Sequence, residues 1–292
     1  MEPIIKWAGG KRRFVDQIIK IVGDNCNDYY EPFLGGAAVL YRINAKRYYC
    51  SDINDELINF YNVVKNNCES LITVLKKDFI PFHNKNFYTK IRNLDRDCAV
   101  FSELSKVFRA ARFIYLNKTC FNGLWRVNSK GENNVPMGDY KKPAILDEDN
   151  LRQAARFFKK HNVSFANCSF EQCVKNASEG DLVYFDPPYD VEEGQNSFTE
   201  YSKSGFNRKS QIKLKKLCDK LILKGVRVAI SNSDTSFIRS LYSGDEYVTY
   251  NIYNKIVSNR TIGANPNSRR RVVELLIVGE KKWKDYCHKR IT

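Results

Sequence analysis

Short apolar runs alternate with longer amphipathic stretches along this chain, and that alternation limits what it can fold into more than any other feature. The apolar run Leu182–Phe185 is typical of a buried strand, and Pro187 and Pro188 stop it. Two further apolar runs, Val226–Ile230 and Val272–Val278, are also expected to be strands. Strands that alternate with helices favour a largely parallel sheet flanked by helices. The sequence therefore predicts an α/β fold.

The first half of the chain begins in this pattern and then departs from it. The expected elements are a strand at Tyr29–Phe33 before Gly35 and Gly36, a helix at Ala37–Asn44, a strand at Arg47–Ser51 before Asp52, and a helix at Glu56–Lys65. Residues 55–145 are mostly helical, polar and aromatic, with a Gly/Asn-rich loop at 121–140. We interpret 55–145 as an inserted helical subdomain, and 1–54 with 146–292 as one α/β domain.

The composition excludes several classes of protein. With 292 residues, 43% hydrophobic and 28% charged, the chain can bury a substantial core, which excludes disordered and fibrous proteins. No stretch approaches a transmembrane helix and the N-terminus has no signal-peptide core, so we expect a soluble, cytoplasmic protein. The nine cysteines form no CxxC pair and the three histidines stand far apart, so we expect no disulfide framework and no metal site.

Positive charge is concentrated in two stretches. The net charge is +15; residues 106–142, with eight basic and two acidic residues, supply +6, and residues 251–292, with ten basic and three acidic, supply +7. Such clusters suit a polyphosphate backbone, because each neutralised phosphate releases a counterion. Nucleic acid is the first partner to test, although solvated charged faces give the same pattern.

Two places in the first half of the chain favour a nucleoside site. Gly35 and Gly36 follow a strand, where the backbone turns tightly and a ligand can lie against it. Asp52 ends the next strand, where its carboxylate can accept hydrogen bonds from both hydroxyls of a ribose. The alternative role for Asp52 is the N-cap of the following helix. Because neither GxGxxG nor a phosphate loop is present, a cofactor with a ribose but no phosphates, such as S-adenosylmethionine, fits better. Its cationic sulfonium suits the acidic and aromatic side chains available: Trp7, Glu31, Phe33 and Asp186.

The strand Leu182–Phe185 is followed directly by Asp186-Pro187-Pro188-Tyr189. The two prolines fix the backbone, so the Asp186 carboxylate, the Pro187 carbonyl and the Tyr189 ring are rigidly oriented at the carboxyl edge of the sheet. The two oxygens can accept both protons of an exocyclic amine and leave its lone pair directed at a methyl donor, while the ring stacks on an extruded base. The simpler alternative is a Pro-Pro turn after a buried strand.

These motifs, in this order, resemble the Dam-type DNA adenine-N6 methyltransferases of the α class (D12 family). The resemblance covers nearly the whole chain, in KWAGGK (6–11), EPFLGGA (31–37), SDIN (51–54), FNGLWRVNSKG (121–131), NVPMGDYKKP (134–143), DPPY (186–189), FTEY (198–201), ISNSD (230–234) and RTIGA (260–264). It implies a Rossmann-like methyltransferase sheet in a domain, 1–54 with 146–292, that binds S-adenosylmethionine. It also implies that the helical subdomain, 55–145, recognises the target.

The resemblance also implies three sets of site residues. The candidate catalytic residues are Asp186, Pro187, Pro188 and Tyr189. The candidate cofactor-binding residues are Trp7, Ala8, Gly9, Lys11, Glu31, Phe33, Gly35, Gly36, Asp52, Ile53, Phe170 and Asp186, with Phe170 packing on the cofactor's adenine. The candidate DNA-binding residues are Lys6, Phe121, Asn122, Leu124, Arg126, Asn128, Asn134, Pro136 and Tyr140. The family's usual target is GATC in duplex DNA, whose adenine is flipped out.

The chemistry of the proposed reading loop agrees with the resemblance. Arg126 can bind guanine O6 and N7 bidentately in the major groove, and Leu124 suits a thymine methyl group. Phe121 and Asn122 can insert where a base has left the stack. The alternatives are a phosphate contact for Arg126 and ordinary core packing for Phe121 and Leu124.

Other classes of protein remain to be separated. A cytosine-C5 methyltransferase usually has a nucleophilic cysteine after a proline, and none of the eight prolines here precedes a cysteine. A cytosine-N4 or protein-glutamine methyltransferase uses a related motif, usually with Asn or Ser at the position of Asp186. A noncatalytic DNA-binding module would bind DNA without a cofactor. We expect an enzyme that acts as a monomer, with no stable complex with any cognate restriction endonuclease.

Overall fold

The computed structural model describes residues 2–192, 206–244, 246–259 and 271–282. The strands are β1 (Asp28–Glu31), β2 (Arg47–Asp52), β3 (Ser164–Asn167), β4 (Leu182–Phe185), β5 (Arg227–Ser233), β6 (Val248–Asn259) and β7 (Arg271–Lys281). The α-helices are α1 (Val15–Val22), α2 (Asp55–Val74), α3 (Lys85–Arg92), α4 (Cys98–Glu103), α5 (Lys106–Thr119), α6 (Glu148–Lys160), α7 (Phe170–Cys173), α8 (Arg208–Leu223) and α9 (Ser236–Leu241). The motifs FTEY (198–201) and RTIGA (260–264) lie outside the described residues.

The seven strands form one sheet in the order β3-β2-β1-β4-β5-β7-β6. The first five of these strands are parallel, and β7 runs antiparallel to both of its neighbours. The order 3-2-1-4-5 is that of a doubly wound sheet, which confirms the predicted Rossmann-like α/β fold flanked by helices. The chain reverses its direction of progress between β1 and β4, and ligands of such sheets bind outside the carboxyl ends of the strands at that switch point.

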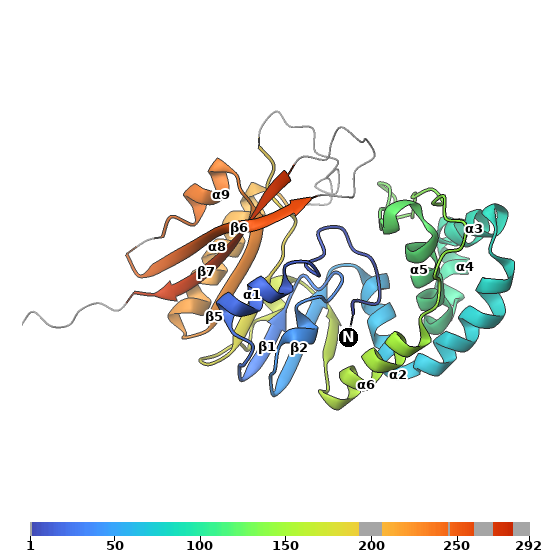
Figure 1. Ribbon diagram of the computed structural model, residues 1–292, viewed down its shortest axis with the longest axis horizontal. Helices are drawn as coiled ribbons and strands as arrows, with labels where there is room; N and C mark the ends of the chain where they lie inside the picture. Colours follow the sequence, from blue (N-terminus) through green and yellow to red (C-terminus); the bar gives the residue numbers. More distant parts are fainter. Residues whose placement is uncertain (1, 193–205, 245, 260–270, 283–292) are drawn as a thin grey trace, which may run out of the picture.

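The sheet separates two hydrophobic cores, because successive side chains of a strand point to opposite faces. Tyr29 and Tyr184 face a core shared with α1, α2, α5 and α6, whereas Tyr30 and Phe185 face a core shared with α8 and α9. Figure 1 shows α3, α4 and α5 gathered at the end of the molecule away from β6 and β7. α2 packs directly onto β2 and β3, and α5 packs against α2, so both helices belong to the same core as the sheet.

The prediction of a helix at Ala37–Asn44 is wrong. Ala37 has a φ of 57°, in the left-handed region that a right-handed helix cannot use, and the segment forms turns with a short 3₁₀ helix at Leu40–Arg42. Two strands went unpredicted. β3 is a four-residue edge strand in which only Phe165 is buried, and β6 mixes polar residues among its apolar ones, so neither shows a continuous apolar run.

Candidate functional site

The turn after β1 is built around a close approach of Trp7 to two glycines. Gly35 has a φ of 45°, and a Cβ there would lie 2.6 Å from Trp7 Cδ1. A Cβ on Gly36 would lie 3.2 Å from Trp7 Cβ. The Tyr61 hydroxyl of α2 donates to the Gly35 carbonyl oxygen over 2.9 Å. Only residues without a side chain allow Trp7 to close over this turn.

Asp52 connects the ends of β1 and β2. Its Oδ2 accepts from the Gly35 N–H at 3.2 Å and its Oδ1 accepts from the Asn54 N–H at 3.0 Å. The alternative role as a helix N-cap is wrong, because α2 begins at Asp55 and its cap is Asn54, whose side chain accepts from the Leu57 N–H. Burial raises the pKa of Asp52, and the backbone N–H donors oppose that rise.

An aromatic group lies beside the same edge of the sheet. The rings of Phe33, after β1, and Phe170, at the start of α7, stack with centroids 5.6 Å apart and an interplanar angle of 26°. Phe185 and Phe206 meet Phe33 edge-on. Ile53, the residue after Asp52, is 75% exposed. The predicted cofactor residues Phe33 and Phe170 are therefore brought together, although the chain separates them by more than a hundred residues.

Asp186 meets the N-terminal segment in a buried ionic cluster. Lys11, which is 2% exposed, places its Nζ 2.9 Å from Asp186 Oδ1 and donates to the Gly9 carbonyl oxygen over 2.6 Å. The same ammonium lies 4.8 Å from the centroid of the Tyr189 ring and 3.5 Å from Glu274 Oε2. Burial raises the pKa of Asp186, and Lys11 opposes that rise by favouring the ionised carboxylate.

Glu31, the last residue of β1, is a second buried carboxyl beside this cluster. It is 3% exposed and accepts a hydrogen bond from the Tyr29 hydroxyl over 2.9 Å. Burial raises the pKa of Glu31 to about 8, and the negative charge of Asp186 adds to the increase. Two carboxyl groups therefore share the switch point of the sheet, from the ends of β1 and β4.

Side chains of α8 and β5 support the Asp-Pro-Pro-Tyr segment from behind. Gln211 donates to the Pro188 carbonyl oxygen over 2.8 Å, and Asn232 donates to Gln211 Oε1 over 3.2 Å. Asp190, just after the segment, receives hydrogen bonds from Arg208 and from the Thr235 hydroxyl. These contacts fix a backbone that the two prolines already restrict.

A second group of predicted residues surrounds Lys6. The buried Asn117 accepts from the Lys6 N–H at 3.0 Å and donates to the carbonyl oxygens of Lys6, at 2.7 Å, and of Gly123, at 3.1 Å. Asn122 and Gly123 both have positive φ, and a Cβ on Gly123 would overlap Lys6. The Lys6 ammonium lies 4.9 Å from the centroid of the Tyr140 ring. Asn117 thus ties the N-terminal segment to the loop after α5.

The predicted reading residues continue along a hairpin. Arg126 is exposed and donates to Asn134 Oδ1 over 2.7 Å, and Asn128 donates to Glu132 across the hairpin. The Phe121 N–H donates to the Pro136 carbonyl oxygen over 2.9 Å. Phe121 is 38% exposed, whereas Leu124 is partly buried against the core.

Charged groups of the neighbouring helices brace this hairpin. Asp95 Oδ2 accepts from the Asn133 N–H and from Arg112, both over 2.7 Å. Arg112 is 1% exposed and also donates to the carbonyl oxygens of Ile91 and Arg92. Because the arginine is satisfied by three acceptors, its burial is tolerated and the base of the hairpin is held.

The predicted site residues thus fall into two groups that the N-terminal segment joins, since Trp7 packs on the glycine turn and Lys6 on the loop after α5. Three supporting residues, Asn117, Gln211 and Glu274, were not predicted. A lone glutamate within the apolar run VVELLIV was a signal for the last of them, since a charge in a buried strand needs a partner. The other two are polar residues of helices, and nothing in their neighbouring sequence marks them.

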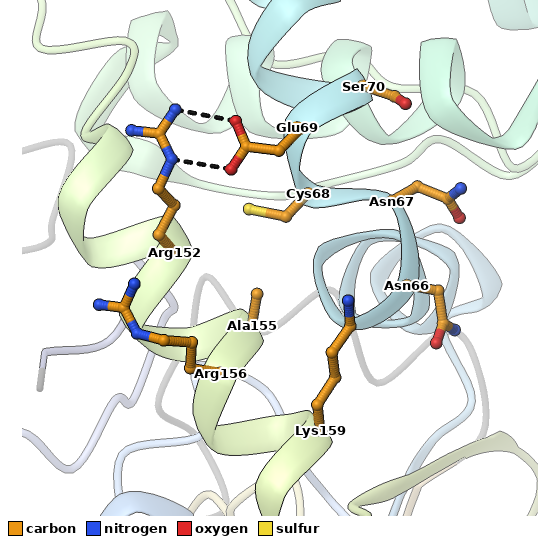
Figure 2. A pocket seen from close by; sticks show the side chains of 9 residues that line it. All are labelled: Asn66, Asn67, Cys68, Glu69, Ser70, Arg152, Ala155, Arg156 and Lys159. Atoms are coloured by element: carbon orange, nitrogen blue, oxygen red, sulfur yellow. Dashed lines mark hydrogen bonds and ion pairs between the residues drawn. The ribbon is translucent and has the colours of Figure 1, made fainter.

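Two cavities lie away from both groups. One, of about 320 Å³, opens between α2 and α6, where α2 departs from helical geometry at Asn67; Figure 2 shows Arg152 paired with Glu69 at its side. The other, of about 530 Å³, lies between α8 and α9. Neither is lined by a predicted site residue.

The described part of the chain lacks two features. No helix within those ranges is long and apolar enough to cross a membrane. Likewise, no group of three or more histidine, cysteine, aspartate or glutamate side chains is placed there to hold a metal ion. The expectation that the reaction needs no metal stays a prediction.

The sheet order and the motifs at its switch point define an α/β methyltransferase. Residues 7–260 match the family described as D12 class N6 adenine-specific DNA methyltransferase, and the chain belongs to this family. It is accordingly an adenine-specific DNA methyltransferase.

Similar proteins span nearly the whole chain. The Type II methyltransferase M1.LlaDCHI of Lactococcus lactis subsp. cremoris is 36% identical over 277 residues, 95% of each chain. The Type II methyltransferase M.MjaIII of Methanocaldococcus jannaschii is 39% identical and covers 95% of this chain and 99% of its own. A DNA adenine methylase of Haemophilus influenzae is 35% identical over 96% of this chain and 94% of its own.

Proposed function

We propose that this enzyme transfers a methyl group from S-adenosylmethionine to N6 of a flipped-out adenine in duplex DNA, with GATC as its target. The observation that carries the proposal is the position of Asp186. Its carboxylate follows β4 directly, at the switch point of the sheet, and Lys11 pairs with it at 2.9 Å. Such an acceptor suits an exocyclic amine, which is a poor nucleophile until its protons are held.

The residues at the end of β1 and β2 fit the cofactor. Each oxygen of Asp52 accepts one backbone N–H, and a carboxylate oxygen has a further lone pair for a ribose hydroxyl. The missing Cβ of Gly35 lets Trp7 close over the turn, and Phe33 and Phe170 supply an aromatic surface for adenine. When bound, the cofactor supplies an activated methyl group on a cationic sulfonium. A cation bound beside the buried carboxyl groups of Glu31 and Asp186 would favour their ionised forms, which suit that positive charge.

The chain's own groups hold the amine. Asp186 and the Pro187 carbonyl oxygen would accept hydrogen bonds from its two N–H groups, which leaves the nitrogen lone pair available for the methyl group. As the new N–C bond forms, the bond from sulfur to that methyl group would break; S-adenosylhomocysteine would be the leaving group, and the methylated amine would lose one proton. Lys11 assists by keeping Asp186 ionised despite its burial. The Tyr189 ring stacks on the flipped base.

The helical part of the chain, 55–145, serves target recognition in this proposal, while 1–54 and 146–292 hold the cofactor and the reacting amine. Arg126 reads a guanine and Leu124 a thymine methyl, with Lys6 alongside. The enzyme acts on DNA as a monomer and needs neither a restriction endonuclease nor a metal ion, so activity should survive EDTA.

The test is Asp186→Ala, with the exposed Asp149→Ala as the control. Methyl transfer should fall by more than about 10²–10³-fold, while DNA affinity and base flipping, followed with 2-aminopurine at the target, should survive. A radiolabelled methyl assay reports the rate. Near wild-type turnover would remove Asp186 from the reaction. Methylated cytosine or peptide would favour another amino methyltransferase, and DNA binding without cofactor binding would favour a noncatalytic module.

A further inference from the structure

Glu274 is a buried acid in the middle of an apolar strand. It is 5% exposed, and the three residues that follow it in β7, Leu275, Leu276 and Ile277, are fully buried. A carboxylate in such surroundings is costly unless hydrogen bonds and a counter-charge compensate it. The contacts that compensate the Glu274 carboxylate therefore indicate its role.

Two contacts of the Glu274 side chain with described residues lead to the catalytic segment. The Tyr189 hydroxyl donates to Glu274 Oε2 over 3.1 Å, and the Lys11 ammonium lies 3.5 Å from the same oxygen. Lys11 in turn pairs with Asp186 and lies over the Tyr189 ring. The Tyr189 hydroxyl is thus held by Glu274 and one face of the ring is approached by the Lys11 ammonium, so a base that stacks on the ring must use the opposite face.

The sheet is irregular next to this glutamate. In β7, Glu274 pairs with Ser233 of β5, and on its other side with Ile256 of β6. Between Tyr253 and Ile256, β6 advances three residues while β7 advances two, from Leu276 to Glu274. Bulges of this kind bend a strand and redirect side chains, often beside active sites.

We propose that Glu274 is a positioning residue of the methyl-transfer site: by holding the Tyr189 hydroxyl, it sets the plane of the ring on which the target base stacks. The inference rests on the proposed function, because it assumes that Tyr189 receives the base. Glu274 itself touches neither base nor cofactor.

The first test compares three changes in β7. Glu274→Met keeps the length of the side chain and removes the acceptor, Glu274→Gln keeps an acceptor oxygen, and Glu280→Ala alters an exposed glutamate of the same strand. Glu274→Met should lower the single-turnover rate by about 10²-fold, the effect of a misplaced reacting group, with DNA and cofactor affinities little changed. Glu274→Gln should recover most of the rate, and Glu280→Ala should leave it unchanged.

The second test is a double-mutant cycle with Tyr189→Phe, which keeps the ring and loses the hydroxyl. If Glu274 acts through that hydroxyl, Glu274→Met should slow the Tyr189→Phe variant far less than it slows the wild type. Fluorescence of 2-aminopurine at the target should rise in both single variants, because a loosened ring stacks and quenches less. A purely structural role for Glu274 would lower stability without this coupling or this signal.

Three outcomes would overturn the proposal. These are an unchanged rate in folded Glu274→Met, equal slowing by Glu274→Met in both backgrounds, and a wild-type rate in Tyr189→Phe. A wild-type rate in Tyr189→Phe would overturn the proposal even if every change at Glu274 unfolds the protein. Retained turnover in Asp186→Ala would instead contradict the proposed function, so the two failures are distinguishable.

Discussion

At the scale of single residues, the site depends on carboxyl groups whose surroundings differ. Asp52 is bound by backbone N–H groups, Asp186 by an ammonium, and Glu31 by one tyrosine hydroxyl. In the proposed function, the same side-chain chemistry serves three tasks: a hydrogen-bond acceptor for a ribose, an ionised acceptor for an amine, and, in the free enzyme, a carboxyl that remains protonated near neutral pH.

Asp52→Ala should weaken cofactor binding by ~1–3 kcal/mol, because hydrogen bonds to a charged acceptor are lost, and should leave DNA affinity nearly intact. Asn54→Ala is the matched control two residues away. It removes the cap of α2, so it should lower the free energy of unfolding by ~1 kcal/mol without changing cofactor affinity. Calorimetry measures the affinities. Unchanged cofactor affinity in Asp52→Ala would contradict the ribose role.

Glu31 predicts a pH-dependent effect. In the unfolded chain a glutamate loses its proton near its usual pKa of 4.5, whereas in the fold Glu31 keeps it until about pH 8. The folded state binds more protons between these values, so Glu31 lowers the free energy of unfolding as pH rises from about 4.5 to about 8.

Glu31→Gln removes this titration and keeps an acceptor for Tyr29. The difference in the free energy of unfolding, variant minus wild type, should be larger at pH 8 than at pH 5 by more than about 1 kcal/mol. Urea denaturation at the two pH values measures the difference. A difference between variant and wild type that does not depend on pH would show that Glu31 ionises normally.

At the scale of elements, the hairpin after α5 presents the proposed reading residues from a rigid base. Asn117 fixes the loop to Lys6, and Asp95 with Arg112 fixes the far strand of the hairpin. Arg126 is exposed above this base and, among the residues that the structure describes, hydrogen-bonds only to Asn134. Such an arginine can turn toward a base edge without disturbing the fold.

Arg126→Ala should reduce discrimination at one guanine of the site by ~1–3 kcal/mol. Lys130→Ala, at the exposed tip of the same hairpin, is the control: it should weaken binding to all sequences alike and make the salt dependence shallower. Binding to substituted duplexes over a range of salt concentrations measures both effects. If Arg126→Ala behaved as the lysine control does, Arg126 would be a phosphate contact.

Local signals account for what could be predicted at this scale. Leu182–Phe185 was predicted with its observed bounds because an apolar run meets two prolines, and the glycine turn and Asp52 stand next to their own strands. The prediction of a helix at Ala37–Asn44 is wrong because Ala37 has a positive φ, which alanine adopts only rarely. Glu274 meets Tyr189 across 85 residues, and strand pairing of that kind has no local signature.

At the scale of the whole molecule, one hydrophobic core links the proposed reading and catalytic groups. The core includes Tyr29 of β1, Leu57 of α2 and Phe113 of α5, and Trp7 stacks on Phe113 while it closes over the glycine turn. Neither group can shift independently of the other without disturbing this packing. In the proposed function the base leaves the duplex within reach of both groups, and a fixed relation between them suits such base flipping.

The central claim is that this enzyme methylates N6 of adenine at GATC, and the most direct measurement is the identity and position of the product. Duplex DNA containing every four-base sequence is incubated with the pure protein, S-adenosylmethionine and EDTA. One portion of the DNA is then read by single-molecule sequencing, and another is digested to nucleosides for mass spectrometry. We expect N6-methyladenine confined to GATC in the wild type, and far less of it in Asp186→Ala after the same incubation. N4-methylcytosine, or methyladenine at unrelated sequences, would contradict it.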